Sequence, residues 1–458
     1  MKLSAALPLL VASTLFMEQL DGTILVTALP NIASSFGGTA AGLDLSVSAY
    51  LVTLSFMIPA SGWIADRLGA KRVYGSAIAV FVLASILCGA SQTVWQFVGA
   101  RILQGFGGAM MVPVGRLIVL RETEKKDLIR SIAYLTWPAL SAPLLGPPLG
   151  GFITTYASWH WIFYINVPLG IVALPFVWKI VPGGQVREPR KFDAAGFFLT
   201  GAAILSLLFS IEFLGRTVVP IVAAIVLFIF GLACGAAAVR RGLNTREPLI
   251  SLVAFRTVTF RLAMRGGGVF RGCLAALPFL LPLLFQVGFG LDPVTSGTLL
   301  LGVFAGNLGM KPATSWILRH VRFRRTMLVS GCIAIATMLG CAMLTAQTPH
   351  VLIIALLVIS GLARSMQFTT ISTLAFSDVP KPAMGSANTL FSMQQQAANA
   401  CGVAVAGALL RLISLSHGGG GVQTVEDFQF TFLIVAIFAA FSMIDFYRVP
   451  LNAGEALR

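Results

Sequence analysis

The sequence predicts an all-α integral membrane protein of fourteen transmembrane helices, and three observations lead to this prediction. Of the 458 residues, 57% are hydrophobic and only 11% are charged, whereas an ordinary soluble domain has roughly 25% charged residues. Apolar stretches of about 20 residues recur along the chain, which is the length that a helix needs to cross a ~30 Å hydrocarbon core. The basic residues gather between alternate stretches, as they do in loops on the cytoplasmic side of a membrane.

The spanning segments are predicted to be helices because their sequences show no strand-like alternation. A segment in lipid must pair its backbone polar groups within the protein, so it is either a helix or part of a closed barrel. Barrel strands alternate in polarity over ~10 residues. The predicted spans cover residues 6–31, 45–65, 73–91, 94–117, 131–155, 161–180, 194–214, 218–239, 262–288, 294–316, 326–345, 350–372, 386–410 and 428–447.

The distribution of Lys and Arg predicts an even number of spans with both termini in the cytoplasm. With these fourteen spans crossing the membrane in turn, 25 of the 32 basic residues fall on one side, with Arg116 counted among them. Only Arg216 and Arg411 fall on the other side, and five lie within spans. Loss of one span would exchange the sides of all later loops, so a wrong count would not give this split.

Several other classes of protein are disfavoured by composition. The net charge of +15 is spread over short clusters instead of forming one basic patch, so we expect no nucleic-acid partner. The six cysteines lie in apolar segments without a CxxC pair, and the four histidines are scattered. This pattern favours packing residues over disulfides or metal ligands, so we expect no metal and no cofactor.

An internal repeat divides the chain. Residues 64–72 and 317–325 align without gaps and each follows a predicted span. Their separation of 253 positions exceeds the length of one six-helix half, and two additional helices near 194–239 account for the excess. We therefore expect a six-helix bundle over 1–182, a linker and two additional helices over 183–241, and a second six-helix bundle over 242–458.

Five motifs in the first half carry a resemblance to a known family. They are Leu20-Asp21-Gly22-Thr23 in the first span, Gly62 to Arg72 after the second, Arg101-Ile-Leu-Gln104-Gly105 in the fourth, Gly146-Pro147-Pro148-Leu149-Gly150-Gly151 in the fifth, and Ser158 to Pro168 at the sixth. As a set and in this order they resemble the fourteen-helix drug:proton antiporters (EmrB/QacA-type) of the major facilitator superfamily. The second half resembles the MdtD/HsrA-like members at 309–311 and 367–369. The resemblance implies the major facilitator fold, with two six-helix bundles and two inserted helices.

Three charged residues within spans are predicted to couple proton movement to transport. An ionisable group at membrane depth is costly and marks a functional site by default. Asp21 fits this description, and Arg101 is its natural partner because it stays charged and offers five donors. The alternative is a permanent ion pair that only fixes packing. Glu18 lies one helical turn from Asp21 and is a second proton site, a cation-binding acid or a solvated side chain.

Two groups of residues are expected to control conformational change. In the loop motif, the acidic residue is predicted to stabilise one conformation, although the basic residues also serve as topology determinants. In the fifth span, small residues allow close helix contact and prolines permit bending, which suggests either a flexing contact or simple tight packing. The predicted gating residues are Gly62, Asp66, Arg67, Gly69, Arg72, Gly146, Pro147, Gly150 and Gly151.

The substrate cavity is expected at the midplane between the two halves. Acids lie on the first-half side of this region and bases on the other, so the sequence allows an anionic or zwitterionic substrate as well as a lipophilic cation. The predicted lining residues are Gln104, Arg271, Gln286, Lys311, Arg364 and Gln367.

Taken with the resemblance, these features imply a proton-coupled exporter of drugs or other lipophilic compounds that works by alternating access. A dedicated transporter of amino-acid-like or anionic metabolites is the alternative, and a transporter-fold sensor is a weaker one. We expect no enzymatic activity and protons as the coupling ion. The expected partners are a small-molecule substrate and the lipid bilayer, and the protein is expected to be a monomer. The expected location is the bacterial inner membrane.

Overall fold

The computed structural model describes residues 3–36, 40–183, 191–215, 221–245, 247–416 and 423–457. Within these ranges the chain is helical and contains no strand. The first part of the chain forms α1 (Leu3–Ser35), α2 (Ala40–Leu68), α3 (Ala70–Gly89), α4 (Val94–Glu122), η1 (Lys125–Asp127), α5 (Leu128–Tyr156), α6 (Trp161–Tyr164) and α7 (Asn166–Ile180). Next come α8 (Ala194–Gly215) and α9 (Ile221–Asn244).

The remaining helices form a second group of similar size. They are η2 (Leu252–Arg256), α10 (Val258–Leu283), η3 (Leu284–Gly288), α11 (Pro293–Gly309), α12 (Lys311–His320), α13 (Phe323–Ala342), α14 (His350–Ser377), η4 (Lys381–Ala383), α15 (Met384–Ser416), α16 (Val425–Tyr447) and η5 (Glu455–Leu457). Each predicted span has a helical counterpart, with α6 and α7 together forming the sixth and α11 and α12 the tenth. Ten helices in the described residues are long and apolar enough to cross a membrane.

Local sequence signals explain where several helices begin. Thr93 accepts a hydrogen bond from the Gln96 N–H at the start of α4, and Thr424 forms a capping box with Asp427 at the start of α16. These side chains satisfy backbone donors that have no partner within the helix. Gly69 separates α2 from α3 with a φ of 87°, a left-handed conformation that glycine adopts without strain. The repeated loop motif thus forms a tight turn between two helices.

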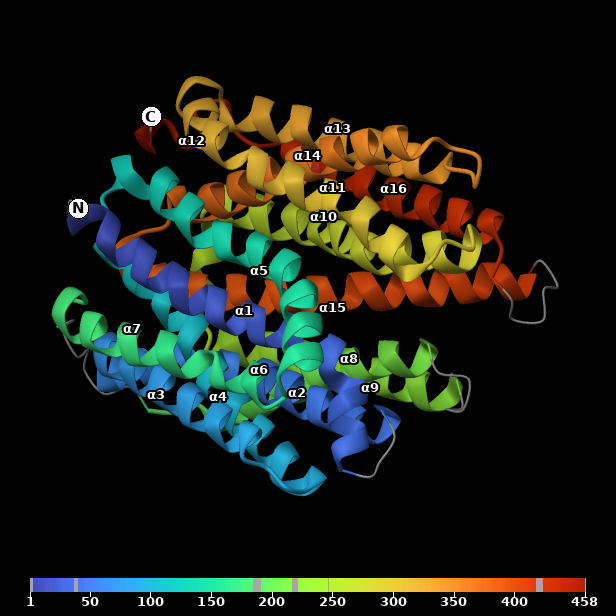
Figure 1. Cartoon of the computed structure of the whole chain (residues 1–458). Coiled ribbons are helices and arrows are strands. Elements are labelled where there is room, and N and C mark those ends of the chain that lie inside the picture. Colours follow the sequence, from blue (N-terminus) through green and yellow to red (C-terminus); the bar gives the residue numbers. More distant parts are fainter. Residues whose placement is uncertain are drawn as a thin grey trace.

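The helices form an elongated bundle with both chain ends at the same end, which we call the terminal end (Figure 1). In the first half (α1–α7), α1 packs along α5, and α4 packs against α2 and α3. In the second half (α10–α16), α14 packs against α11 and α13, and α10 packs against α15 and α16. The two halves meet where α2 and α4 contact α15 and where α5 contacts α14.

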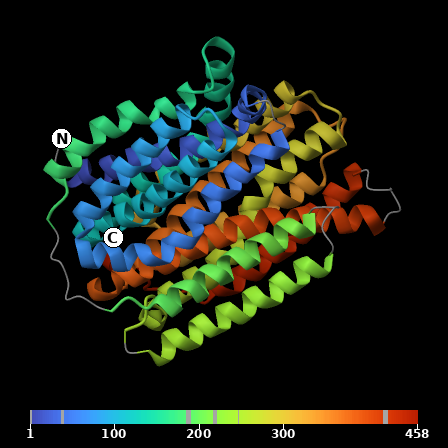
Figure 2. The same ribbon diagram turned by 90° about the horizontal axis from the view of Figure 1, so that it is seen from below.

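The helices α8 and α9 lie on one flank of the bundle (Figure 2). They pack against each other, and α8 also contacts α2 of the first half and α15 of the second. Asp193, just before α8, accepts hydrogen bonds from the Gly196 N–H at 2.9 Å and from Arg241 Nε of α9 at 2.7 Å. This joins the start of α8 to the end of α9 at the terminal end.

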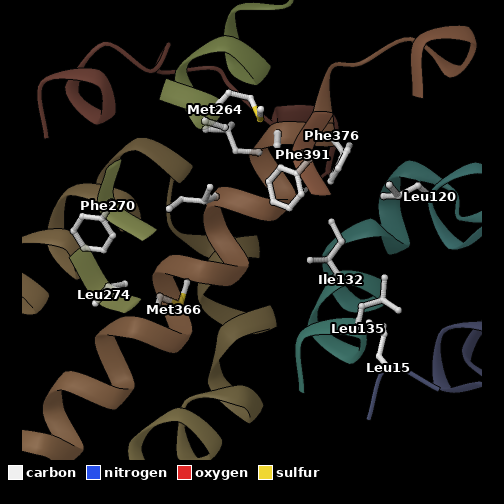
Figure 3. Packing of buried hydrophobic residues seen from close by; sticks show 14 of the residues in the cluster. Leu15, Leu120, Ile132, Leu135, Met264, Phe270, Leu274, Met366, Phe376 and Phe391 are labelled. Atoms are coloured by element: carbon white, nitrogen blue, oxygen red, sulfur yellow. The ribbon is translucent and has the colours of Figure 1, made fainter. Parts of the chain in front are cut away.

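One hydrophobic cluster extends through both halves. In its central part, apolar side chains of α1, α4 and α5 lie opposite aromatic side chains of α14 and α15 (Figure 3). The labelled residues there are Leu15, Leu120, Ile132, Leu135, Phe376 and Phe391. The same six side chains border the cavity described below, so the interface between the halves is apolar around a hollow centre.

The described contacts between the halves lie toward the terminal end. A Cβ at Gly62 of α2 would lie 2.7 Å from Thr389 Oγ1 of α15, and Asn388 Nδ2 donates to the Pro113 carbonyl of α4 at 2.8 Å. Lys311 of α12 donates to Thr136 Oγ1 of α5 at 2.7 Å. The first two contacts join the start of α15 to α2 and α4, and the third joins α12 to α5, so the two halves are in contact at the terminal end.

The close packing of α11 on α14 generates a stability prediction. A Cβ at Gly306 would collide with the Val358 carbonyl, whereas a Cβ at Gly297, also on α11, meets nothing within 4 Å. We expect Gly306→Ala to destabilise the protein by about 1–3 kcal/mol through overpacking, and Gly297→Ala to be neutral or to stabilise it by about 0.5–1 kcal/mol. Thermal unfolding in detergent measures both, and equal melting temperatures would contradict the close α11–α14 contact.

The contact at Asp193 generates a pH prediction. Burial raises the pKa of this carboxyl, but hydrogen bonds from the Gly196 N–H, Arg241 and the Leu249 N–H outweigh burial and leave the pKa lowered. A lowered folded-state pKa gives stability that is present above the unfolded value, about 3.9, and is lost as the pH falls through the folded value. We expect Asp193→Asn to lower the melting temperature at pH 7, and this difference to shrink only below about pH 4. Asp378→Asn, a change at an exposed carboxyl, is the control and should have no such effect.

Candidate functional site: a buried ion pair and a central cavity

A buried carboxylate on α1 accepts hydrogen bonds from three side chains. Asp21 is 1% exposed. Its Oδ2 accepts from Arg101 of α4 at 2.7 Å, and its Oδ1 accepts from Gln104 Nε2 at 2.8 Å and from Asn166 Nδ2 at 2.9 Å. A buried charge is tolerated when it is paired and fully hydrogen-bonded. The structure thus brings together Asp21 and Arg101, which the sequence paired, and adds two neutral donors.

The neighbours of this ion pair connect five helices. Arg101 Nη1 also donates to Gln104 Oε1 at 2.5 Å, and the guanidinium lies 4.3 Å from the ring centroid of Tyr50 on α2. Ser85 Oγ of α3 accepts from Gln104 at 2.9 Å and from Asn166 at 3.2 Å. We call Asp21, Arg101, Gln104, Asn166 and Ser85 the Asp21 network. Because its members come from α1, α3, α4 and α7, with Tyr50 from α2, it cross-links most of the first half.

The local chain explains why these side chains meet. Arg101 and Gln104 are three residues apart on α4 and therefore lie on the same face of that helix. Asn166 is the first residue of α7, directly after the short helix α6 ends at Tyr164. The break between α6 and α7 places this amide, which is 0% exposed, beside Asp21. Its Oδ1 has no hydrogen-bond partner, so its role here is that of a donor.

Glu18 has a different environment from Asp21, although the two residues are one turn apart. Its Oε1 accepts a hydrogen bond from the Tyr50 hydroxyl at 3.2 Å, while its Oε2 is buried without a partner. Glu18 also lines the central cavity, which Asp21 does not. Asp21 therefore lies within the first half, whereas Glu18 faces the interface between the halves.

The central cavity has a volume of about 300 Å³ and is enclosed by both halves. The first half contributes Glu18 and Gln19 of α1 and Arg116 of α4. From the second half, the polar lining consists of Arg271 on α10, Arg364 and Ser372 on α14, and Ser392, Gln395, Gln396 and Asn399 on α15. The remainder is largely apolar and includes Phe368, Phe376 and Phe391. Such a lining accommodates an apolar body and orients it with a few polar contacts.

The cations that the sequence placed in the cavity occupy two positions. Arg271 and Arg364 line it directly. Lys311 lies at its edge, where Nζ donates to Thr136 at 2.7 Å and to Thr369 at 3.1 Å. Met310 separates α11 from α12, and Pro312 supports the new helix start because its missing N–H is not needed there. This break lets Lys311 cross to the first half.

The three glutamines that the sequence placed in the cavity lie elsewhere. Gln104 belongs to the Asp21 network. Gln367 accepts from Ser330 at 2.7 Å and donates to the Met327 carbonyl at 3.2 Å, so it joins α14 to α13 within the second half. Gln286 is exposed in the π-helical segment η3 and contacts Ser296 at 3.4 Å. These glutamines form hydrogen bonds between helices or segments. A sequence does not show whether a glutamine within a span bonds another helix or a ligand.

The loop motif lies at the terminal end. Asp66 Oδ1 accepts from Arg121 Nη2 of α4 at 2.7 Å, and both side chains are about one quarter exposed. Arg121 lies against α15, since a Cβ at Gly385 would be 3.0 Å from its Nη2. Arg67 stacks over Trp63 at 5.2 Å, and Arg72 is exposed. The acid therefore pairs with a basic residue of its own half that touches the other half.

In the glycine- and proline-rich motif of α5, Gly146 faces α1. Gly146 is buried, and a Cβ there would collide with Thr23, two residues after Asp21. Thr23 also contacts the Ala142 carbonyl at 3.3 Å. Gly150 is buried and Gly151 is partly exposed, with nothing within 4 Å of a Cβ at Gly151. Pro147 lies in α5, and its side chain is outside the described part of the structure.

Four contributing residues were not selected from the sequence. Asn166 lies in a quoted motif, so its position within the resemblance was an available signal. Arg116 was counted with the cytoplasmic cluster although it falls inside the predicted span 94–117, and the structure places it in the cavity. Tyr50 and Ser85 are single polar residues in apolar helices, and no sequence pattern separates them from similar residues that only pack.

The role of Asn166 as a donor to a charged acceptor generates a prediction. We expect Asn166→Leu to destabilise the protein by about 1.5–3 kcal/mol, the range for a hydrogen bond to a charged group. Asn388→Leu removes a buried amide that donates to the neutral Pro113 carbonyl, and we expect it to cost about 0.5–1.5 kcal/mol. Thermal unfolding of the two variants in parallel tests this. A larger loss for Asn388→Leu would mean that Asn166 does not stabilise the Asp21 charge.

Comparison with known proteins places the whole arrangement in one superfamily. A protein of Pectobacterium carotovorum that bears the name MdtD, with multidrug resistance as its provisional description, is 34% identical over 443 residues, covering 96% of this chain and 95% of that protein. Its counterpart in Salmonella heidelberg is 36% identical over 457 residues, covering 96% and 94%. The crystal structure of the human organic anion transporter MFSD10 superimposes with a TM-score of 0.68 at 13% identity, covering 95% of this chain and 99% of that one.

The family description "Major Facilitator Superfamily" matches residues 11–403, which include the Asp21 network and the cavity. The low identity to the solved structure supports the shared fold alone, whereas the two bacterial relatives match almost the full chain. Two helical halves around a central cavity, the loop motif and these matches agree: the chain is a multi-pass membrane protein that belongs to the Major Facilitator Superfamily.

Proposed function

We propose that the protein is a proton-coupled secondary exporter that moves small drug-like molecules by alternating access. The observation that supports this most strongly is the Asp21 network, a buried carboxylate with a fixed cationic partner, one helical turn from a second carboxyl that faces the central cavity. The multidrug resistance description of the bacterial relatives supports a drug-like substrate. We further propose that the chain has no enzymatic activity and requires no cofactor.

In this mechanism Asp21 and Glu18 exchange protons while the two halves alternate. With Asp21 ionised, Arg101, Gln104 and Asn166 hold α1, α4 and α7 together in the arrangement described here. Protonation of Asp21 removes the charge that these donors stabilise, so it weakens the contact of α1 with α4 and α7. Helix α1 also packs on α5 through Thr23 and Gly146, so a shift of α1 is transmitted to the helix that contacts α11, α12 and α14 of the second half.

The energetics permit useful accumulation. One charge moving through 100 mV is worth about 2.3 kcal/mol. At about 1.4 kcal/mol per tenfold change, this corresponds to a concentration ratio of about 50-fold for the exported molecule. Coupling requires only that the proton site and the cavity respond to the same rearrangement, and the distance of one helical turn between Asp21 and Glu18 favours this.

We propose that the terminal end faces the cytoplasm of a bacterium and that the protein lies in its inner membrane. The 25 basic residues assigned to that side support this orientation. The contacts at the terminal end, including Gly62 with Thr389 and Asn388 with Pro113, then close the cavity toward the cytoplasm. We also propose that the protein works as a monomer, with functional units 1–182, 183–241 and 242–458.

Proton flux in proteoliposomes tests the proposal. Purified wild type is compared with Asp21→Asn across a panel of lipophilic cations, neutral drugs and organic anions, with internal pH followed by a trapped dye. We expect wild type to move protons with at least one compound and Asp21→Asn to lose about 100-fold or more of this flux, a typical effect of removing a proton-transfer group.

A matched control separates charge from position. Asp445→Asn changes a largely buried acid of the second half, which lies 3.7 Å from the exposed Arg265, and we expect it to retain proton flux. If Asp21→Asn transports as well as wild type, the Asp21–Arg101 pair is structural. If no panel compound drives proton flux in wild type, proton-coupled export itself is wrong.

A further inference from the structure

We propose that Arg271 and Arg364 form a subsite for the anionic group of the cargo, so that the exported molecule is an organic anion with an aromatic or apolar body. This inference rests on the proposed export function and specifies its substrate class. Four features support it: missing partners for both arginines, aromatic faces that hold them, an excess of positive charge in the cavity, and an apolar wall opposite.

The first feature is the lack of hydrogen-bond and ion-pair partners. Arg271 is 2% exposed, and its Nε and Nη2 are buried without a hydrogen-bond partner. Arg364 has a buried Nε with no partner. No acidic side chain in the described part of the structure forms a salt bridge with either arginine. A buried guanidinium without an anion is costly. Arg101, by contrast, forms an ion pair with Asp21.

The second feature is the aromatic setting. The guanidinium carbon of Arg271 lies 4.8 Å from the ring centroid of Phe368 and 5.0 Å from that of Phe391. That of Arg364 lies 5.5 Å from Phe368, four residues along α14. Stacking on ring faces stabilises a cation while leaving its edge N–H groups available. The rings thus stabilise both guanidinium groups at the cavity, and the N–H groups without partners suit the two-oxygen geometry of a carboxylate.

The third feature is the charge of the cavity. Arg116, Arg271 and Arg364 line it, and Glu18 is the only acid among its described lining residues. Arg116 is held by neutral contacts with Ser392 at 3.4 Å and Gln395 at 3.3 Å. Glu18 lies on α1, across the interface from α10 and α14. An anion at Arg271 and Arg364 would supply the missing negative charge, whereas a lipophilic cation would add to the excess.

The fourth feature is the wall on the first-half side. Leu15, Leu54, Ile58, Ile132 and Leu135 form an apolar surface there. The cavity volume of about 300 Å³ accommodates a ring system of moderate size. The polar and apolar walls therefore fit a molecule with its anionic end toward α10 and α14 and its ring toward α1, α2 and α5.

The test uses three probes with the same ring and different charges: 2-naphthoate, uncharged 2-naphthamide and cationic 2-naphthylmethylammonium. Binding to protein in lipid nanodiscs is measured by calorimetry, without a proton gradient. We expect naphthoate to bind at least about tenfold more tightly than naphthamide, and the ammonium compound to bind most weakly.

Arg271→Gln and Arg364→Gln should each weaken naphthoate binding by about tenfold or more and leave naphthamide binding nearly unchanged. Arg265→Gln, on the same helix as Arg271 but 62% exposed, is the matched control and should match wild type.

A second measurement identifies a merely structural role. Because an unpaired buried charge destabilises the empty protein, we expect Arg271→Gln without ligand to unfold at a higher temperature than wild type. A lower temperature, or equal binding of the three probes, would overturn the inference. If naphthoate binds through these arginines but drives no proton flux in proteoliposomes, the subsite stands and the export mechanism fails. If the Asp21 experiment succeeds with a cation while naphthoate does not bind, only the subsite is wrong.

Discussion

The ion pair between Asp21 and Arg101 is the interaction on which the arrangement of the first half depends. Its carboxylate is satisfied by donors from α4 and α7, and those donors also bond Ser85 of α3. In a low-dielectric interior such a network stabilises one arrangement only while every member is paired. Protonation of Asp21 would therefore weaken contacts of several helices at once.

The two halves use charge differently, and this difference organises the cavity. In the first half the buried arginine has a carboxylate, and the result is a closed internal network. In the second half Arg271 and Arg364 have ring faces instead of anions, so their charge is directed toward the space between the halves. The first half thus holds Arg101 in an internal ion pair and presents Glu18 and Arg116 to the cavity, whereas Arg271 and Arg364 of the second half face the cavity without an acidic partner of their own half.

Much of the fold followed from sequence because lipid imposes simple rules. Span lengths, the distribution of Lys and Arg and the 64–72 repeat each depend on local composition, and every predicted span has a helical counterpart. The pairing of Asp21 with Arg101 was predictable for a similar reason, since two charges at membrane depth need each other. The positions of Gln104, Gln286 and Gln367 were not predictable, because a buried amide serves a helix contact as well as a ligand. The position of Asn166 beside Asp21 was also not predictable, because it depends on the break between α6 and α7, which arises from tertiary packing.

The position of α8 has a consequence for how molecules reach the transporter from the lipid. The seam between the halves reaches the bilayer on two sides, beside α2 and α15 on one and beside α5 and α14 on the other. Because α8 contacts both α2 and α15, it covers the first of these sides along the membrane plane. The inserted pair is not packed on the other side, where α5 contacts α14, so any lateral entry from a leaflet would have to lie there. The inserted pair α8 and α9 thus covers the seam on one side of the bundle and not on the other, although the two halves are related by a repeat.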